Sequence, residues 1–352
     1  MTSRLLAIDV REACRPKRTG KAQWTYGFVS ELVRRGEPLL LLTDVQIPAE
    51  WNAPSVQVHR ITRTGMWWHV AAVSFLQQSK NIRCYVSPTS YIVPALLGSS
   101  VPHILVVHDL IAFRAERHNV RATIVERLTL GRAVRHAAHV LTVSESTKRD
   151  LLARYPSLSP EKVTSVFAGP MRTTVPLNKP DGRTILCVAT LCPRKNQERL
   201  IKAFASLPND IRNNHRLVLA GGRGWHDDAI VSLARSTPGV EWVGHVNDAE
   251  YERLLQTCDA FALPSLYEGF GMQILDALQR GIPILTSDRG SLKEVAGDAA
   301  CVVDPESVES ISGGLRLLLT DVTVRGVLRK NGPVQAQRFS WKKTVDLFLA
   351  TL

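Results

Sequence analysis

The sequence predicts an α/β protein built from two doubly wound, Rossmann-like domains that face each other across an interdomain cleft. The chain has 352 residues, which is more than one ordinary core holds and suits two domains of roughly 150–200 residues each. Short apolar runs alternate with longer helical patterns along both halves, and this alternation is typical of βαβ units and parallel sheets. Ligands in such sheets bind beyond the carboxyl ends of the strands, so we expect the binding site in the cleft.

The apolar runs and the turn-forming residues set the expected boundaries. Residues 1–175 form the first domain and 176–338 the second, and the stretch 170–182, with its prolines, is the expected linker. Residues 339–352 form a terminal amphipathic helix with Ser340 as its N-cap. Helical patterns also cover 24–35 and 122–137, and the expected strands are 5–9, 38–42, 83–86, 104–107, 139–143, 184–189, 216–220, 240–243, 260–263, 282–286 and 300–303.

Composition narrows the class of protein. Hydrophobic residues make up 45% of the chain and charged residues 22%, as in a globular protein and not in a disordered or fibrous one. The longest apolar stretch, 92–113, is interrupted by prolines, histidines and an aspartate, which argues against a membrane-spanning helix, and no signal peptide is predicted. The six cysteines include no Cys-x-x-Cys pair, so we expect no metal site, no disulfide framework and a reduced cytoplasmic environment.

Charge is distributed unevenly along the chain. Residues 1–179 contain 24 Lys and Arg against 12 Asp and Glu, whereas residues 180–352 contain 20 of each. The excess of positive charge in the first half suggests an acidic partner, such as anionic lipid headgroups, a phosphorylated acceptor or nucleic acid, although a solvated basic surface has the same composition. No recognised nucleic-acid-binding module is present, so we expect no nucleic acid as a partner.

A strand–loop–helix pattern over 262–277 carries the strongest functional signal. Glu268 begins a Glu-Gly-Phe-Gly loop, in which glycines let the backbone approach a ligand and the following helix directs free amides at the loop. Asp276 lies eight residues later, on about the second turn of the helix, where we expect it to face the open site. Two carboxylates beside such amides suit a sugar nucleotide, because carboxylates accept hydrogen bonds from hydroxyls while amides bind the diphosphate. An ordinary turn with a capping acid is the alternative.

Two other loops carry candidate residues. The loop 189–196 ends in Arg194 and Lys195 just before a helix, where cations oppose the helix dipole and therefore suggest a bound anion such as a diphosphate. In the first half, Gly20 lies in the first βα loop, without the full Gly-x-Gly-x-x-Gly fingerprint of dinucleotide binding. His108 ends an apolar strand at its carboxyl end, where sites of α/β proteins lie, although a single histidine is often structural.

Several segments resemble the family-4 retaining glycosyltransferases of the GT-B fold, especially bacterial mannosyltransferases and other hexosyltransferases of polysaccharide assembly. The segments occur in the family's order and cover nearly the whole chain, which makes the ordered set more specific than any single motif. The matching segments are 19–20, 107–110, 141–146, 188–196, 220–224, 243–246, 264–276 and 281–286.

The resemblance implies roles for individual residues. It implies that Glu268 binds donor-sugar hydroxyls and that His108 contacts the donor sugar near the reacting carbon, so these two are the expected catalytic residues. The last helix is expected to cross back to the first domain. The implied donor-binding residues are Arg194 and Lys195 for the diphosphate, Arg223 and Val243 near the nucleobase, Asp276 at the ribose, and Gly20, Thr190, Gly269, Phe270, Gly271 and Met272 elsewhere in the site.

The resemblance also implies a mechanism. Family-4 enzymes retain the anomeric configuration, by a front-face displacement in which the leaving phosphate helps to deprotonate the acceptor. They need no metal and no cofactor, because basic side chains and helix N-termini stabilise the leaving diphosphate, and this sequence contains no Asp-x-Asp motif. Asp276 stands where the family typically has Glu, and Met272-Gln273 replace the common Leu-Pro, so the ribose contact and the sugar pocket depart from the family pattern.

The expected donor is GDP-mannose, with UDP-hexoses and dTDP-rhamnose as alternatives. The expected acceptor is a saccharide or a lipid-diphosphate-linked saccharide, reached by docking of the basic first domain on the cytoplasmic face of a membrane. The apolar segment 66–75 suits a membrane interface because it contains Trp67 and Trp68, unless both tryptophans belong to a helix core. Two competing functions also fit these motifs, namely a sugar-nucleotide epimerase and a non-catalytic sugar-nucleotide-binding subunit.

Overall fold

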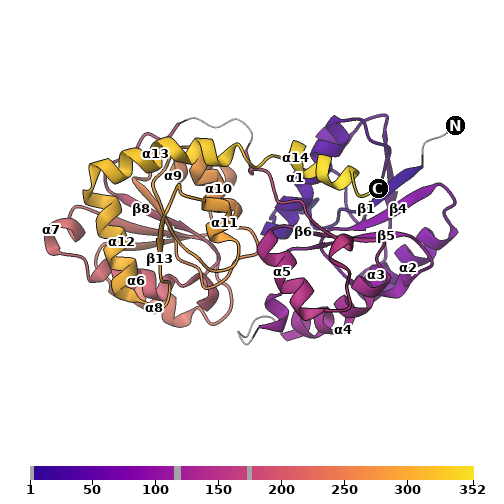
Figure 1. Ribbon diagram of the computed structural model, residues 1–352, viewed down its shortest axis with the longest axis horizontal. Helices are drawn as coiled ribbons and strands as arrows, with labels where there is room; N and C mark the ends of the chain where they lie inside the picture. The colour runs from indigo at the N-terminus through magenta and orange to yellow at the C-terminus, as the bar shows by residue number, and fades with distance from the viewer. Residues whose placement is uncertain (1–3, 115–119, 173–176) are drawn as a thin grey trace. The chain divides into compact units, whose positions relative to one another are not determined.

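The computed structural model describes residues 4–114, 120–172 and 177–352. The chain divides into two compact units, Met1–Met171 with Ser340–Leu352 and Arg172–Phe339 (Figure 1). Each unit contains one parallel sheet with helices packed on it, so the prediction of two Rossmann-like sheets is confirmed. Residues 173–176, inside the predicted linker 170–182, lie outside the described residues.

The N-terminal unit has a seven-stranded sheet in the order β3-β2-β1-β4-β5-β6-β7, counted over the described residues. All neighbouring strands in it are parallel, and the order is that of a doubly wound fold with one strand added. The strands are β1 (Leu5–Asp9), β2 (Leu39–Thr43), β3 (Val56–Arg60), β4 (Ile82–Ser87), β5 (His103–Val107), β6 (His139–Thr142) and β7 (Val163–Ser165), and the helices are α1 (Gly20–Arg34), α2 (Gly65–Gln78), α3 (Ile92–Leu97), α4 (Val120–His136), α5 (Glu145–Arg154) and α14 (Trp341–Leu349).

Two strands at the edges of this sheet were not predicted from the sequence. β3 forms one edge and is half exposed, so it lacks the continuous apolar run that marks the buried β1 and β2. β7 forms the other edge and is three residues long, which is too short to give a pattern. Sequence reasoning therefore finds the buried centre of the sheet and misses its edges.

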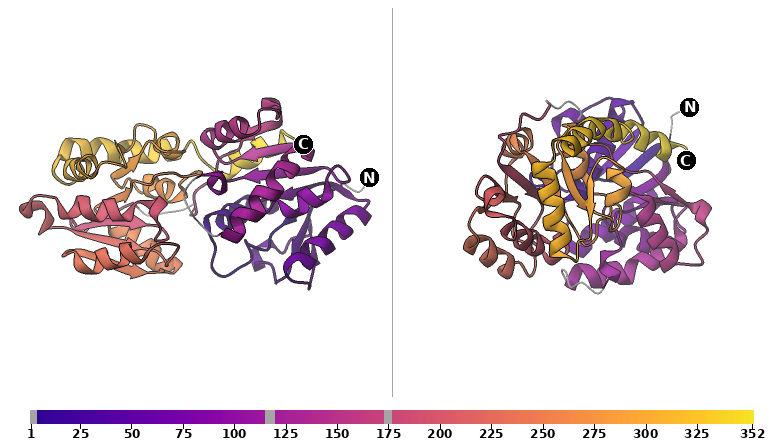
Figure 2. Two further views of the ribbon diagram at one scale, coloured as in Figure 1. Left: turned by 90° about the horizontal axis from the view of Figure 1, so that it is seen from below. Right: turned by 60° about the vertical axis from the view of Figure 1, so that its left-hand side comes forward.

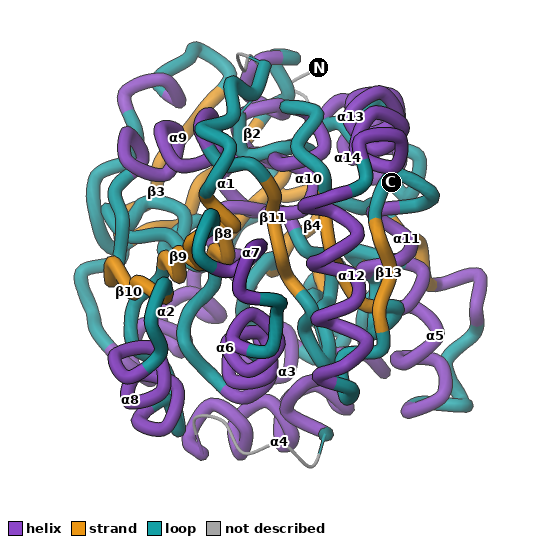
Figure 3. The backbone as a smooth tube through the Cα atoms, turned by 90° about the vertical axis from the view of Figure 1, so that its left-hand side faces the viewer, coloured by secondary structure: helices purple, strands orange, loops and turns teal. Residues whose placement is uncertain are grey.

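The C-terminal unit has a parallel six-stranded sheet in the order β10-β9-β8-β11-β12-β13 within the described part of the chain (Figure 3). The chain runs outward from β8 to β10 and then returns to β11 on the other side of β8, which makes the gap between β8 and β11 the topological switch point. The strands are β8 (Thr184–Val188), β9 (Arg216–Ala220), β10 (Val240–Gly244), β11 (Ala260–Leu263), β12 (Ile284–Ser287) and β13 (Cys301–Val303), and the helices are α6 (Gln197–Ala205), α7 (Asn209–Arg212), α8 (Asp228–Ser236), α9 (Asp248–Thr257), α10 (Met272–Gln279), α11 (Leu292–Ala296), α12 (Val308–Thr320) and α13 (Val322–Ala336).

The helices α2, α3 and α4 form one layer on the N-terminal sheet. Side chains of α2 and α3 pack together on β1, β2 and β4 around Trp68 and Tyr85. The other side of α3 packs with α4 on β5 and β6 around Leu130. Because α3 contributes to both clusters, the three helices lie side by side. No helix in the described ranges is long and apolar enough to cross a membrane.

The terminal helix α14 belongs to the N-terminal unit, against which its yellow ribbon lies in Figures 1 and 2. Ser340 caps it by accepting a hydrogen bond from the amide of Lys343 at 3.2 Å, as predicted. The indole Nε1 of Trp341 donates to the carbonyl oxygen of Pro170 at 2.8 Å. The ring lies against Gly27 of α1 and against Gly169, because a Cβ at either glycine would lie within 2.1 Å or 2.5 Å of Trp341 atoms.

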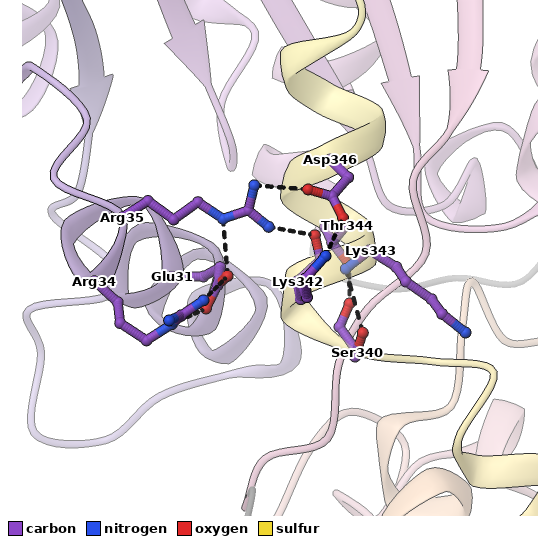
Figure 4. A network of polar contacts seen from close by, with 8 residues as sticks. All are labelled: Glu31, Arg34, Arg35, Ser340, Lys342, Lys343, Thr344 and Asp346. Carbon is purple, nitrogen blue, oxygen red and sulfur yellow. Dashed lines mark hydrogen bonds and ion pairs between the residues drawn. The ribbon is translucent and has the colours of Figure 1, made fainter.

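A polar network joins the exposed side of α14 to α1 (Figure 4). The guanidinium of Arg35 donates to Asp346 at 2.7 Å and to the carbonyl oxygen of Lys342 at 2.8 Å. Its Nε donates to Glu31 at 2.9 Å, and Arg34 pairs with the same carboxylate at 2.7 Å. Exposed ion pairs of this kind contribute little each, so the apolar contact of Trp341 stabilises the helix more than the network does.

We expect Gly27→Ala to destabilise the protein, because the new methyl group collides with the Trp341 ring. Overpacking of this kind costs about 1–3 kcal/mol of unfolding free energy, which urea denaturation followed by tryptophan fluorescence would measure. Gly20→Ala is the matched control on the same helix, because a Cβ there meets nothing within 4 Å. Equal stability of the Gly27→Ala and Gly20→Ala variants would contradict the proposed contact.

Candidate active site

Two loops of the C-terminal unit meet at its switch point. One loop follows β8 and contains Arg194 and Lys195, and the other follows β11 and contains Glu268. Because β8 and β11 are adjacent and parallel, both loops leave the sheet at the same edge. The amide of Leu266 donates to the carbonyl oxygen of Arg194 at 2.8 Å, which ties the two loops together directly.

Asn196 holds the same two loops and was not singled out by sequence reasoning. Its backbone adopts a left-handed conformation with φ of 62°, which Asn tolerates better than most residues, between a short 3-10 turn and α6. Its side-chain Nδ2 donates to the carbonyl oxygens of Pro264 at 2.9 Å and Pro305 at 2.7 Å. The sequence signal was available, since an Asn directly before a helix is a candidate for a left-handed turn.

A third loop, which contains Gly290 and Ser291, contacts the backbone of Glu268. The amide and the hydroxyl of Ser291 both donate to the carbonyl oxygen of Glu268, at 3.1 Å and 3.2 Å. A Cβ at Gly290 would lie 2.3 Å from that same oxygen, so only glycine permits this approach. Gly271, with φ of 91°, ends the Glu268 loop and begins α10. These contacts fix the position of the Glu268 backbone, from which its side chain extends.

The side chains of the two loops form a buried ion cluster. Glu268 Oε2 accepts from Arg194 Nη1 at 2.9 Å, and Glu268 Oε1 accepts from Lys195 Nζ at 2.5 Å. Arg194 Nη1 also donates to the carbonyl oxygen of Tyr267 at 2.6 Å. Burial alone would raise the pKa of Glu268, but the charges of Arg194 and Lys195 outweigh it and lower that pKa to about 2. The cluster therefore holds two cations and one carboxylate at neutral pH.

Asp276 does not face an open site, and that part of the prediction is wrong. The residue has a relative exposure of 0% on α10. Its Oδ2 accepts a hydrogen bond from the hydroxyl of Tyr251 on α9 at 2.9 Å. One turn later, Arg280 is also buried, donates to the carbonyl oxygen of Asp276 at 2.7 Å and pairs with Glu252 at 2.6 Å. The shorter Asp side chain thus lies against the α9 helix, in a polar contact between two helices.

The predicted nucleobase region lies along the edge of the same sheet, beside the ion cluster. The loop that holds Thr190 runs against Gly221, where a Cβ would lie 1.9 Å from the carbonyl oxygen of Ala189. Leu191 forms a parallel bridge to Arg223, so the structure brings Thr190 and Arg223 together. Arg223 pairs with Asp227 at 2.8 Å and also with Asp228. Val243 is 37% exposed near the end of the edge strand β10.

The remaining residues of the Glu268 loop are mostly buried. Phe270 is 6% exposed and packs edge-on against Phe339 with ring centroids 5.6 Å apart, and Met272 is 8% exposed. Contacts from Phe270 and Met272 to a ligand would therefore come from the backbone. Among the described residues, no group of three or more His, Cys, Asp or Glu side chains is placed to hold a metal ion.

His108 and Gly20 lie at the carboxyl edge of the N-terminal sheet, in a separate unit from Glu268. The His108 Nε2 atom is 2.7 Å from the carbonyl oxygen of Pro88, and the ring packs edge-on against Trp24 at 5.4 Å. Burial, followed by the charge of Lys21, lowers the pKa of His108 to about 4, so the ring is neutral at pH 7. A carbonyl only accepts, so Nε2 carries the hydrogen and Nδ1 is left as an acceptor for a hydroxyl.

Two charged pairs near this edge were missed by sequence reasoning. Asp9, at the end of β1, accepts from Arg11 at 2.9 Å and 3.1 Å, and the Arg11 guanidinium lies 3.3 Å from the centroid of the Trp68 ring. Of the two tryptophans in the segment 66–75, Trp68 belongs to the core, whereas Trp67 is 68% exposed. Lys21 of α1 lies 3.9 Å from Glu126 of α4. Neither pair shows in the sequence, because each joins residues from different elements or depends on an adjacent ring.

Comparisons with known proteins find a family that resembles the C-terminal unit. The family described as Glycosyl transferases group 1 matches residues 174–335. O-antigen chain mannosyltransferase B of Escherichia coli is 38% identical over 160 residues, which are 45% of this chain and 42% of that protein. MMP alpha-(1->4)-mannosyltransferase of Mycolicibacterium hassiacum is 29% identical over 220 residues, 60% of this chain and 53% of that protein. The matches thus span about half the length of these relatives.

Solved structures resemble the whole chain. Sucrose-phosphate synthase from Thermosynechococcus elongatus has a TM-score of 0.79 at 17% identity and covers 99% of this chain and 98% of its own. Anabaena HepE in complex with UDP and glucose has a TM-score of 0.76 at 16% identity, with coverages of 99% and 100%. The chain therefore has the GT-B fold, as the ordered motifs predicted. Residues 174–335 of its C-terminal unit match the group 1 family, in agreement with the resemblance that the motifs predicted.

We expect the stability of the protein to depend on the ionisation of Glu268. The pKa of this carboxyl is lowered from 4.5 to about 2, so its stabilisation is complete above the unfolded-state value and is lost as the pH falls towards 2. A shift of this size corresponds to roughly 3 kcal/mol. Urea denaturation should show the difference in unfolding free energy between wild type and Glu268→Gln shrinking by about this amount between pH 6 and pH 2. Glu306→Gln, an exposed acid on the same unit, should give a difference that stays small at every pH.

Proposed function

We propose that the protein is a retaining hexosyltransferase that moves mannose from GDP-mannose onto a saccharide or lipid-linked saccharide acceptor, in polysaccharide or O-antigen assembly. The observation that carries this proposal is the meeting of Arg194, Lys195 and Glu268 at the switch point, because it combines a cationic diphosphate site with a carboxylate that accepts sugar hydroxyls. The two relatives that guide the choice of sugar are both named as mannosyltransferases. UDP- or dTDP-linked hexoses are the alternative donors.

The charges of Arg194 and Lys195 would stabilise the leaving diphosphate. Cleavage of the bond between the anomeric carbon and the diphosphate oxygen leaves a negative charge, which preorganised cations stabilise without rearrangement. The acceptor hydroxyl attacks from the same face, and its proton passes to the departing phosphate oxygen, so the anomeric configuration is retained. The proposal assigns no metal ion and no cofactor to this step. Glu268 would bind hydroxyls of the donor sugar, and on the N-terminal unit the Nδ1 atom of His108 would accept a hydrogen bond from a sugar hydroxyl.

We expect Arg194→Ala and Lys195→Ala each to reduce kcat/KM with GDP-mannose by about 10²–10³-fold, as for the loss of one charge-stabilising donor. Lys202→Ala is the matched control, because this lysine lies on α6 and pairs with Glu198 at the surface. Purified protein would be assayed with labelled GDP-, UDP- and dTDP-sugars and candidate acceptors, after a thermal-shift screen to select the donor. The anomeric configuration of the product, read by NMR, tests retention.

Two outcomes would favour other functions. Conversion of the sugar nucleotide into another sugar nucleotide without any acceptor would indicate an epimerase. Donor binding without turnover, equally strong in wild type and Glu268→Ala, would indicate a non-catalytic sugar-nucleotide-binding subunit. Failure of all three sugar-nucleotide classes to raise the melting temperature would contradict the proposed donor site.

We also propose that the basic N-terminal unit docks at the cytoplasmic face of a membrane to reach a lipid-linked acceptor. Helices α2 and α4 both begin at the carboxyl edge of the sheet, where the acceptor would bind. Trp67 and Val120, in the first turns of these helices, are both 68% exposed, and Leu128 in the middle of α4 is 75% exposed. Basic residues close to anionic lipid add about 1 kcal/mol each, and tryptophan suits the interface.

We expect flotation with phosphatidylglycerol vesicles at low salt, reduced several-fold by Trp67→Ser combined with Leu128→Ser. Val322→Ser is the control, since this residue is 82% exposed on the C-terminal unit and its loss removes apolar surface away from the proposed docking face. Binding should also fall at 0.5 M NaCl, because screening weakens the attraction of basic residues to anionic lipid. Flotation that is absent, or equal for all three proteins, would argue against docking through this unit.

A further inference from the structure

In the unliganded site, Glu268 already binds the two cations that the proposed function assigns to the donor diphosphate. Each carboxylate oxygen has one cationic partner, Arg194 at 2.9 Å and Lys195 at 2.5 Å. The three side chains are only 16%, 8% and 8% exposed, so little water is present to screen them. The Glu268 carboxylate thus occupies the position of an anionic ligand and supplies part of its negative charge.

A diphosphate that joins this cluster must lie close to the Glu268 carboxylate. Among the described residues, Lys195 Nζ donates only to Glu268, so two of its three N–H groups are left for a phosphate. A phosphate on Lys195 would then share that ammonium with Glu268, at a separation of roughly 5 Å. Like charges at this distance in a poorly hydrated site repel strongly. Binding of an anion therefore depends on whether the negative charge of the Glu268 carboxylate is offset.

A sugar-bearing donor and a bare diphosphate differ in whether they offset the charge of the Glu268 carboxylate. In the proposed function, hydroxyls of the donor sugar donate hydrogen bonds to Glu268, which disperses the charge of the carboxylate and offsets its repulsion of the phosphates. A nucleoside diphosphate has no sugar to do so and carries additional negative charge. The site itself therefore distinguishes substrate from product through one side chain.

We propose that Glu268 makes the site prefer the sugar-bearing donor over the nucleoside diphosphate product, by pairing again with Arg194 and Lys195 once the sugar has left. The inference rests on the proposed function. During transfer, the bond from the anomeric carbon to the diphosphate oxygen breaks, the bond to the acceptor oxygen forms, and the acceptor proton leaves with the diphosphate. Glu268 has then lost its hydroxyl partners, and its negative charge weakens the attraction of both cations for the product.

The fixed backbone makes this exchange a matter of side chains alone. Ser291 holds the carbonyl oxygen of Glu268, and the amide of Leu266 holds that of Arg194. Asn196 bonds both to the Glu268 loop, through Pro264, and to Pro305. The carboxylate therefore exchanges partners between the cations and a sugar over a short distance, without an opening of the loops.

The test measures binding of inorganic diphosphate, GDP and GDP-mannose by isothermal titration calorimetry, so it does not require turnover. Glu268→Gln should bind inorganic diphosphate and GDP at least tenfold more tightly than wild type, while GDP-mannose gains less, so that the preference for donor over product falls. Glu306→Gln controls for the change in net charge and should stay within twofold of wild type. Glu268→Asp keeps the charge but withdraws it by one methylene, and should bind diphosphate with intermediate affinity even where the Gln variant folds poorly.

Diphosphate affinity that is unchanged or weaker in a cooperatively melting Glu268→Gln protein would overturn the inference while leaving the proposed function standing. It would mean that Glu268 holds the cations in position for phosphate instead of competing with it. If no form of the protein binds any diphosphate or sugar nucleotide, the proposed donor site fails and the inference fails with it. A product inhibition constant for GDP that falls tenfold in Glu268→Gln, with an unchanged one in Glu306→Gln, would support the inference in the turnover assay.

Discussion

A carboxylate with almost no access to water stays ionised only where positive charge surrounds it, and this constraint organises the C-terminal unit. Glu268 meets it with Arg194 and Lys195, which lie 74 and 73 positions away in the chain. The pairing needs β8 and β11 to be neighbours, since only then do their loops emerge together. The doubly wound strand order is therefore a requirement of the site as well as of the fold.

The two units use this topology for different purposes. Both have a parallel sheet with the doubly wound order, but the C-terminal switch point gathers cations around one acid. At the N-terminal edge, Asp9 neutralises Arg11, and His108 is neutral at pH 7. One unit thus presents charge suited to phosphate, and the other presents compensated charge and neutral donors and acceptors suited to hydroxyl groups.

Much of the fold followed from the sequence, because buried parallel strands are continuous apolar runs. The strands around β1 and β8 were found within a residue or two, whereas the half-exposed edge strand β3 was missed. The pairing of Glu268 with its cations could be anticipated only as proximity, since the distances depend on Asn196 and on the close approach of Gly290. The burial of Asp276 was mispredicted because helical spacing places a residue on a turn but does not say what the neighbouring helix covers.

The position of α14 has a consequence for how the chain is made. Trp341 fills the space beside Gly27 and Gly169, so the core of the N-terminal unit is incomplete until residues 340–352 have left the ribosome. Domains generally fold in the order of synthesis, but here the whole of Arg172–Phe339 is translated first. The N-terminal unit therefore remains incomplete, with the Trp341 site on α1 uncovered, while the C-terminal unit completes its own sheet. During synthesis, the two units finish folding in the reverse of their order along the chain.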